Sequence, residues 1–89
     1  MQYGWDERKR RSNILKHGVD FILAYGFDWN SAAVAPDPKD YGEHRLRATG
    51  YIGNRLYRMI YTERGNITRI ISLRKANKRE KRSYEKTIS

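Results

Sequence analysis

Residues 45–75 set the architecture of this chain, and they read RLRATGYIGNRLYRMIYTERGNITRIISLRK. Runs rich in β-branched and aromatic residues alternate here with two segments typical of tight turns, Gly53-Asn54 and Glu63–Asn66. The stretch therefore predicts three consecutive antiparallel strands, over residues 44–52, 55–62 and 67–73.

The third of these predicted strands mixes apolar and polar residues on both faces. With strict alternation, Ile67, Ile71 and Leu73 share one face, whereas Ile70 lies on the other. A strand that is covered on both sides has this pattern, so we expect it to be a central strand of the sheet.

The residues before this stretch predict a short strand followed by two helices. Met1–Trp5 alternates weakly and carries two aromatic rings, which favours a first strand. Asp6 can cap a helix over Glu7–His17, and Gly18 suits the left-handed conformation that ends a helix. Asp20 is placed to cap a second, short amphipathic helix that begins one residue later.

The remaining segments complete an α+β domain. Ala32–Ala35 is a short apolar run typical of an edge strand, and Pro36–Gly42 contains both prolines and indicates a loop. Residues 76–85 are rich in Lys, Arg and Glu and predict a charged C-terminal helix. The sequence thus predicts a single domain over residues 1–89, with an antiparallel sheet of three or four strands, two N-terminal helices and one C-terminal helix.

Composition excludes several classes of protein. The chain has no cysteine, so neither a disulfide framework nor a Cys-based zinc site is available. Its apolar runs are far shorter than the roughly 18 residues that cross a bilayer. The N-terminus lacks the basic and apolar regions of a secretory signal. We therefore expect a cytoplasmic protein that does not insert into a membrane.

Positive charge is concentrated in the second half of the chain. Nineteen Lys and Arg stand against ten Asp and Glu, which gives a net charge of +9. Residues 1–44 contribute −1 and residues 45–89 contribute +10. Such an asymmetry indicates an anionic partner, such as RNA, DNA, an acidic protein or a lipid surface.

Neither a metal site nor a nucleophilic enzyme is indicated. His17 and His44 are the only histidines, and they lack the spacing of metal ligands. The sequence contains no G-x-S-x-G motif and no Gly-rich phosphate loop before a helix. We therefore expect no cofactor and no functional metal ion.

The basic and aromatic residues of the second half suit RNA, because cations neutralise phosphates and rings stack on exposed bases. Cleavage of RNA needs a base for the 2′-hydroxyl, cations for the charge that develops on phosphorus, and an acid for the leaving 5′-oxygen. His17 and Glu43 are the candidate proton carriers, since histidine changes its charge near neutral pH. Arg74 and Lys75 are the candidate phosphate clamps.

Structural alternatives and other functions stay open at this point. His17 can act as a cation that stabilises a helix end, Glu43 can form a salt bridge with Arg45, and the run Lys78–Arg82 can be a solvated helix face. A non-catalytic basic module can bind RNA or ribosomes through phosphate contacts alone. A DNA-binding regulator is a third possibility, although neither a helix-turn-helix motif nor a β-ribbon with side chains that could contact bases is evident.

Several motifs occur in the same order as in a known family. Asn13-x-x-Lys16-His17-Gly18-Val19-x-Phe21 resembles the opening signature of the BrnT family, the toxins of a bacterial type II toxin–antitoxin system. The later motifs are Pro36-Asp37-Pro38 with Gly42-Glu43-x-Arg45, Tyr61-Thr62-Glu63-Arg64-Gly65, and Arg69-Ile70-Ile71-Ser72-x-Arg74-Lys75-Ala76. The resemblance extends from about residue 5 to about residue 85.

The resemblance implies a RelE-like fold and an RNA-cleaving toxin that inhibits translation. Since no metal site is indicated, we expect a metal-independent endoribonuclease. The resemblance also implies a BrnA-type antitoxin with a ribbon-helix-helix domain as a partner. The two proteins together would repress their own promoter, so that operator DNA is bound only through the complex.

The predicted site combines these arguments. Tyr84 and Arg79 join it because RelE-like nucleases place tyrosine and basic groups beside the strand ends. The predicted catalytic residues are His17, Arg74, Lys75 and Tyr84. The predicted RNA-binding residues are Glu43, Arg45, Arg69, Arg79 and Arg82.

Overall fold

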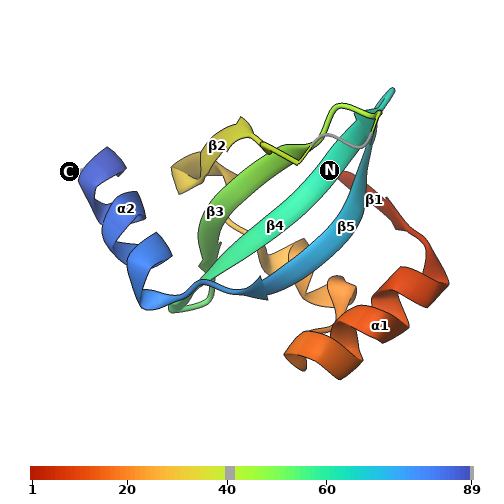
Figure 1. The fold of residues 1–89 in the computed structure, drawn as a ribbon, viewed down its shortest axis with the longest axis horizontal. Helices are drawn as coiled ribbons and strands as arrows, with labels where there is room; N and C mark the ends of the chain where they lie inside the picture. Colours follow the sequence, from red (N-terminus) through yellow and green to blue (C-terminus); the bar gives the residue numbers. More distant parts are fainter. Residues whose placement is uncertain (40–41, 89) are drawn as a thin grey trace.

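A computed structural model of the chain describes residues 1–39 and 42–88 (Figure 1). In chain order, the elements are β1 (Gln2–Trp5), α1 (Glu7–His17), the 3-10 helices η1 (Phe21–Gly26) and η2 (Trp29–Ser31), β2 (Ala33–Pro36), β3 (Leu46–Ile52), β4 (Arg55–Arg64), β5 (Ile67–Lys75) and α2 (Lys78–Ile88). Asp40 and Tyr41, which belong to the predicted loop Pro36–Gly42, lie outside the described residues.

The strands form one sheet in the order β1-β5-β4-β3-β2. Strand β1 runs parallel to β5, and the other neighbours are antiparallel. Figure 1 shows α1 beside β1 and β5, and α2 at the other side of the sheet, near β2. The predicted α+β class is confirmed, as are the three consecutive strands of the second half of the chain.

The predicted number of strands and the purely antiparallel sheet are wrong. Both short runs that indicated strands, Met1–Trp5 and Ala32–Ala35, do form edge strands, so the sheet has five strands within residues 1–39 and 42–88, instead of the three or four predicted. Each edge strand pairs through only four residues, and a signal of that length carries little weight in a sequence. Alternation also says nothing about strand direction, so the parallel pair of β1 and β5 could not be foreseen.

Helix α1 has the predicted bounds because its two ends carry strong local signals. The Asp6 carboxylate accepts a 2.8 Å hydrogen bond from the Arg8 amide. At the other end, Gly18 adopts φ 67°, and its amide donates to the Ile14 carbonyl at 2.8 Å.

The second predicted helix is instead the 3-10 helix η1, although Asp20 caps it as expected, with 3.1 Å from its carboxylate to the Ile22 amide. Only six residues separate Asp20 from Phe27, which returns to extended backbone and enters the core. A segment this short gains little from α-helical hydrogen bonds, and 3-10 turns are common in such pieces.

The hydrophobic core lies between one face of the sheet and the segment that follows α1. Its buried members are Val19, Phe21, Ala24, Phe27, Ala48, Tyr57, Met59, Tyr61, Ile70 and Leu73. The strict alternation predicted for β5 is wrong, because Ile70 and Leu73 are 1% and 0% exposed on the same side. In the pairing with β4, Tyr61 lies opposite Ile70 but Ile60 lies opposite Ser72, so Ile71 is the extra residue of a β-bulge that shifts the alternation.

Asn13 ties α1 to the sheet. Its buried amide donates to the carbonyls of Leu73 at 2.7 Å and Val19 at 2.9 Å, and its oxygen accepts from the Leu73 amide at 3.1 Å. Strand β1 pairs with β5 only as far as Ile70, so Asn13 replaces a neighbouring strand beyond that point. This contact fixes the C-terminal end of α1, and therefore His17, beside the second half of β5.

Helix α2 covers one end of the opposite sheet face. Leu56, Ala76 and Tyr84 form a small buried cluster there. The helix starts at a capping box, in which the Glu80 amide donates to the Asn77 side chain at 2.8 Å and the Asn77 amide donates to Glu80 at 3.0 Å. The rest of this sheet face is left for the arginines described next.

Candidate nucleic-acid interface

The sheet face opposite the core carries arginines from all three inner strands. Arg58 on β4 lies opposite Thr49 of β3 and opposite Arg74 of β5, and cross-strand neighbours of this kind point to the same side of a sheet. Alternation along β3 and its leading residues adds Arg47 and Arg45 to that side. Arg69 of β5 joins them because it lies opposite Thr62, which is on the side of Arg58. We call the set the arginine face: Arg45, Arg47, Arg58, Arg69 and Arg74.

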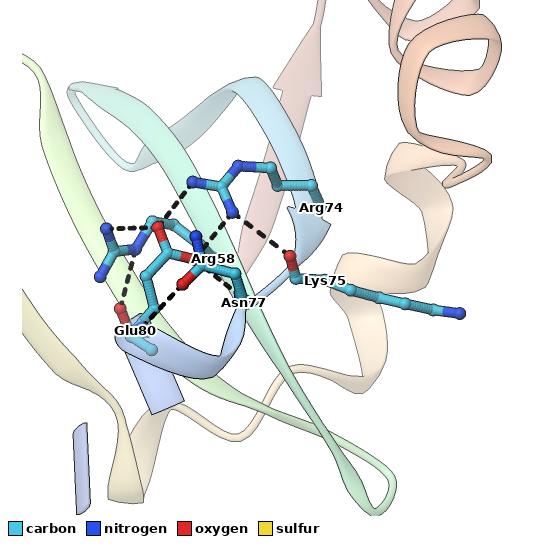
Figure 2. A network of polar contacts seen from close by, with 6 residues as sticks. Arg58, Arg74, Lys75, Asn77 and Glu80 are labelled. Atoms are coloured by element: carbon cyan, nitrogen blue, oxygen red, sulfur yellow. Dashed lines mark hydrogen bonds and ion pairs between the residues drawn. The ribbon is translucent and has the colours of Figure 1, made fainter. Parts of the chain in front are cut away.

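Glu80 of α2 joins two of these arginines in one network (Figure 2). The Arg74 guanidinium donates from Nη1 to Oε1 at 2.8 Å and from Nη2 to Oε2 at 2.7 Å. Arg58 Nη1 lies 2.9 Å from the same Oε2, and Arg58 Nε donates to the Thr49 hydroxyl at 3.3 Å. The two-pronged bond holds the Arg74 guanidinium plane in a fixed orientation, and Arg58 is held by its ion pair and its bond to Thr49.

The charges of the network are set by these contacts. Hydrogen bonds from Arg74 lower the pKa of Glu80 from 4.5 to about 2, against the effect of burial. Burial lowers the pKa of Arg58, and the like charges of Arg47 and Arg74 act in the same direction. Glu80 is therefore a permanent anion at neutral pH, and it does not carry protons there.

A hollow of about 170 Å³ lies beside the network, bounded by β2, β3 and α2. We call it the arginine hollow. Its polar lining comes from the guanidinium groups of Arg47 and Arg58, the Glu80 carboxylate and hydroxyl side chains. The lining residues are Ala33, Val34, Ala35, Arg47, Thr49, Arg58, Glu80, Ser83, Tyr84 and Thr87.

A second hollow, of about 260 Å³, lies at the end of α1, and we call it the histidine hollow. It is lined by Lys9, Ser12, Asn13, Lys16, His17, Arg45, Ile71 and Ser72. Ser72 of this hollow and Arg47 of the other both pair with Ile60 of β4. Arg47 and Ser72, one residue from each hollow, therefore lie about two strand spacings apart, roughly 10 Å.

The structure brings several of the predicted site residues together. His17 and Arg45 line the same hollow, and the Glu43 carboxylate lies 3.7 Å from Arg45 and 3.5 Å from Arg64. The salt-bridge alternative for Glu43 is thus observed. Arg69 belongs to the arginine face, opposite Thr62.

Two predicted residues on α2 also lie near this surface. Arg79 and Arg82 line a shallow depression together with Ser83 and Lys86. Ser83 lines the arginine hollow as well, so this depression adjoins it. The basic run of α2 therefore extends the positive surface beyond the sheet.

The other two predicted catalytic residues, Lys75 and Tyr84, do not present a free polar group to the arginine hollow. Lys75 is opposite Tyr57, a core residue, and Figure 2 shows its side chain pointing away from Glu80. Tyr84 is 3% exposed, its ring contacts the edge of Tyr51, and its hydroxyl donates to the Ser31 carbonyl at 2.7 Å. The tyrosine therefore contributes only its ring to the wall of the arginine hollow.

Sequence reasoning missed Arg47, Arg58 and Glu80 as site residues. A signal for the two arginines was present, because a two-residue turn at Gly53-Asn54 places Arg58 opposite Thr49 and hence on the side of Arg47. No comparable signal existed for Glu80, whose position depends on how α2 packs against the sheet.

The described residues include no group of three His, Cys, Asp or Glu side chains that could hold a metal ion. Within the same residues, no helix has both the length and the apolar character needed to cross a membrane.

Comparison with known proteins agrees with this geometry. The model of the BrnT family, described as the ribonuclease toxin of a type II toxin–antitoxin system, matches residues 5–80. Curated protein sequences gave no match. The matched segment runs from the end of β1 into α2 and includes both hollows, apart from the later α2 residues of the arginine hollow. The chain therefore belongs to the BrnT family of ribonuclease toxins of type II toxin–antitoxin systems.

Proposed function

We propose that this chain is a metal-independent endoribonuclease that cleaves RNA bound across the arginine face and thereby inhibits translation in the cytoplasm. The family supplies the ribonuclease activity and the antitoxin relationship. The single structural observation that supports an RNA-binding role is the register that places arginines of β3, β4 and β5 on one side of the sheet. Guanidinium groups in fixed orientations bind phosphates in two-pronged fashion.

In this proposal the reaction takes place at the histidine hollow. His17 accepts the proton of a ribose 2′-hydroxyl, whose oxygen then forms a bond to phosphorus while the bond from phosphorus to the 5′-oxygen breaks. The leaving oxygen takes a proton from solvent, which reaches this exposed hollow, and the products are a cyclic phosphate and a 5′-hydroxyl. Arg45 in the hollow and Arg74 on the same face supply positive charge for the phosphate.

Lys75 and Tyr84 have no part in this reaction scheme. The Lys75 side chain points away from the Glu80 network, and the Tyr84 hydroxyl is engaged with Ser31. Arg69, Arg79 and Arg82 instead extend the surface along which the RNA strand lies.

The partner in this proposal is a BrnA-type antitoxin that covers part of the arginine face. A surface with this excess of positive charge favours an acidic segment of the antitoxin. The ribbon-helix-helix domain of the antitoxin then brings the complex to operator DNA, where the complex represses its own promoter.

A second candidate function is a non-catalytic module that binds RNA or ribosomes. The observation that favours it is the ionised state of Glu80, which leaves the arginine hollow rich in cations but without a proton carrier at neutral pH. Such a module would inhibit translation by binding to RNA or ribosomes, without cleaving RNA.

Expression in cells without the antitoxin separates the two functions. We expect wild-type protein to arrest growth and co-expressed antitoxin to relieve the arrest. His17→Gln is expected to abolish the arrest while its affinity for RNA stays within about twofold, because a neutral amide of similar size removes the proton carrier and leaves the arginines in place. Arrest by His17→Gln at the wild-type level would favour the binding module, and normal growth with soluble wild-type protein would contradict both functions.

A further inference from the structure

We propose that the arginine hollow binds one phosphate group of a single RNA strand, that Arg47 and Arg58 hold this phosphate, and that Glu80 is the positioning residue that orients Arg58. This inference rests on the proposed function, since it names a substrate contact of the same face. It assigns a role to three residues that the sequence did not single out as parts of the site.

Positive groups outnumber carboxylates around the hollow. Among the described residues, Arg58 lies beside the like charges of Arg47 and Arg74, and Glu80 is the carboxylate that forms ion pairs with Arg58 and Arg74. Asp37 also acts on Arg58, but only as the weakest of the charges that do so. Because the side chain of Arg58 is 16% exposed, water screens this excess of positive charge only in part. An added anion would therefore stabilise the cluster.

Two contacts hold the Arg58 guanidinium in place. Its Nη1 forms an ion pair with Glu80 Oε2 at 2.9 Å, and its Nε donates to the Thr49 hydroxyl at 3.3 Å, which together restrict the plane of the group. Within the described part of the chain, Nη2 has no hydrogen-bond partner, and Arg58 lines the hollow. Fixing a guanidinium in advance removes much of the entropy cost of binding an anion.

The size of the hollow suits a phosphate group. The hollow, about 170 Å³, is several times larger than the roughly 30 Å³ that one water occupies. It is also smaller than the roughly 300–1,000 Å³ of pockets that enclose small organic ligands. A phosphate group therefore fits the hollow better than a base and its sugar do.

The hollow has basic groups on two sides. On one side it adjoins the depression lined by Arg79, Arg82 and Lys86. On the other side, Arg47 lies about two strand spacings, roughly 10 Å, from Ser72 of the histidine hollow. Neighbouring phosphates of one extended strand can thus reach basic groups in succession. The arrangement favours a single strand over a free phosphate ion as the ligand.

The test measures the affinity of a short RNA in which every ribose carries a 2′-O-methyl group, so that it binds without being cleaved. Arg47→Lys and Arg58→Lys keep the net charge of the protein but lose the two-pronged guanidinium. We expect each to weaken binding about tenfold, as for a lost hydrogen bond to a charged group. Arg11→Lys, an exposed position on α1 away from both hollows, is the matched control and is expected to bind like wild type.

Glu80→Gln separates positioning from simple electrostatics, because the two effects have opposite signs. The variant loses one negative charge and so raises the net charge of the protein by one. Long-range attraction alone would therefore strengthen RNA binding. If Glu80 positions Arg58, the variant binds RNA more weakly, by about threefold or more. Glu85→Gln, at an exposed position of the same helix, makes the same change of net charge without removing a contact of the arginines, and we expect it to bind RNA at least as tightly as wild type. Thermal unfolding of each variant establishes that it is folded.

The outcomes are distinguishable. Wild-type affinity in both Arg→Lys variants, or tighter binding by Glu80→Gln, would overturn the inference even if the protein cleaves RNA. The predicted losses in a protein that does not cleave RNA would support the phosphate site and contradict the proposed activity. Variants that lose affinity for the antitoxin but bind RNA normally would make the hollow an antitoxin contact and overturn the inference.

Discussion

Asn13 illustrates how one buried amide positions a functional residue at a distance. The sequence identified this residue only as part of a family motif, whereas the structure gives it three hydrogen bonds to backbone groups of β5 and of the segment after α1. Hydrogen-bond partners 60 residues away in the chain leave no local pattern. The same reason explains why the partnership of Glu80 with Arg58 and Arg74 could not be predicted, although Arg74 itself was.

Replacing Asn13 by alanine is expected to destabilise the fold. The substitution leaves the Leu73 amide and two carbonyls without partners in a buried place, so we expect a loss of about 2–4 kcal/mol in the free energy of unfolding. Urea denaturation followed by circular dichroism measures it. Ser12→Ala, one residue away on the same helix, is the control and should change stability by less than about 0.5 kcal/mol. A loss below about 1 kcal/mol for Asn13→Ala would contradict the role assigned to the amide.

The ion pairs of Glu80 predict a defined dependence of stability on pH. Because folding lowers the pKa of this carboxyl from 4.5 to about 2, its contribution is fully present above pH 4.5 and is lost as the pH falls toward 2. Glu80→Gln should therefore be less stable than wild type at pH 7, by about 1–3 kcal/mol, and the difference should shrink steadily below pH 4.5. A difference that is constant between pH 7 and pH 2.5 would show that the ion pairs contribute nothing.

The sequence predicted best those elements whose ends are marked by local residues, such as a capping aspartate or a left-handed glycine. Helix α1 has an aspartate cap and a left-handed glycine, and its bounds agree to the residue. Strand β5 was found, but the side on which Ile70 lies was wrong, because a bulge depends on the pairing with β4 and not on β5 itself. Residues 21–26 form a 3-10 helix because Phe27 is drawn into the core, which is a tertiary effect.

The contact of β3 with the segment after η1 gives a prediction at the level of elements. A Cβ added at Gly50 would lie 2.7 Å from Phe27 Cζ and 3.1 Å from the Cβ of Ala32. Gly50→Ala should therefore push the Phe27 ring out of the core and reduce the free energy of unfolding by about 1–3 kcal/mol. Gly26→Ala is the control, since its added Cβ would meet Ile52 Cγ2 at an ordinary 3.5 Å. Equal stability of the two variants in thermal unfolding would contradict the close packing of β3 on Phe27.

At the scale of the whole molecule, charge asymmetry was the most informative property of the sequence. It indicated an anionic partner before any element was placed, and the register of the inner strands gathers five arginines of the second half of the chain on the arginine face. The family and the α+β class were also accessible, because both rest on motifs that are local in the chain. The two hollows were not, since each combines residues from the two halves of the sequence.

An RNA interface built on this face predicts strong salt dependence. If the five arginines of the arginine face each neutralise a phosphate, the logarithm of the affinity should fall with the logarithm of salt concentration with a slope of about −3.5. Affinity for a 2′-O-methyl RNA should then drop about 100-fold between 50 and 200 mM salt, as measured by fluorescence anisotropy. An affinity that is unchanged over this range would contradict an interface dominated by phosphate contacts.

The central claim is that this chain itself cleaves RNA without a metal ion. The most direct measurement is the cleavage of a labelled RNA by purified protein in EDTA, without ribosomes, beside the His17→Gln variant. The account predicts cleavage by wild type in EDTA and a rate at least about 100-fold lower for His17→Gln. RNA that stays intact in EDTA and is cleaved only after Mg²⁺ is restored, or that stays intact in every condition, would contradict it.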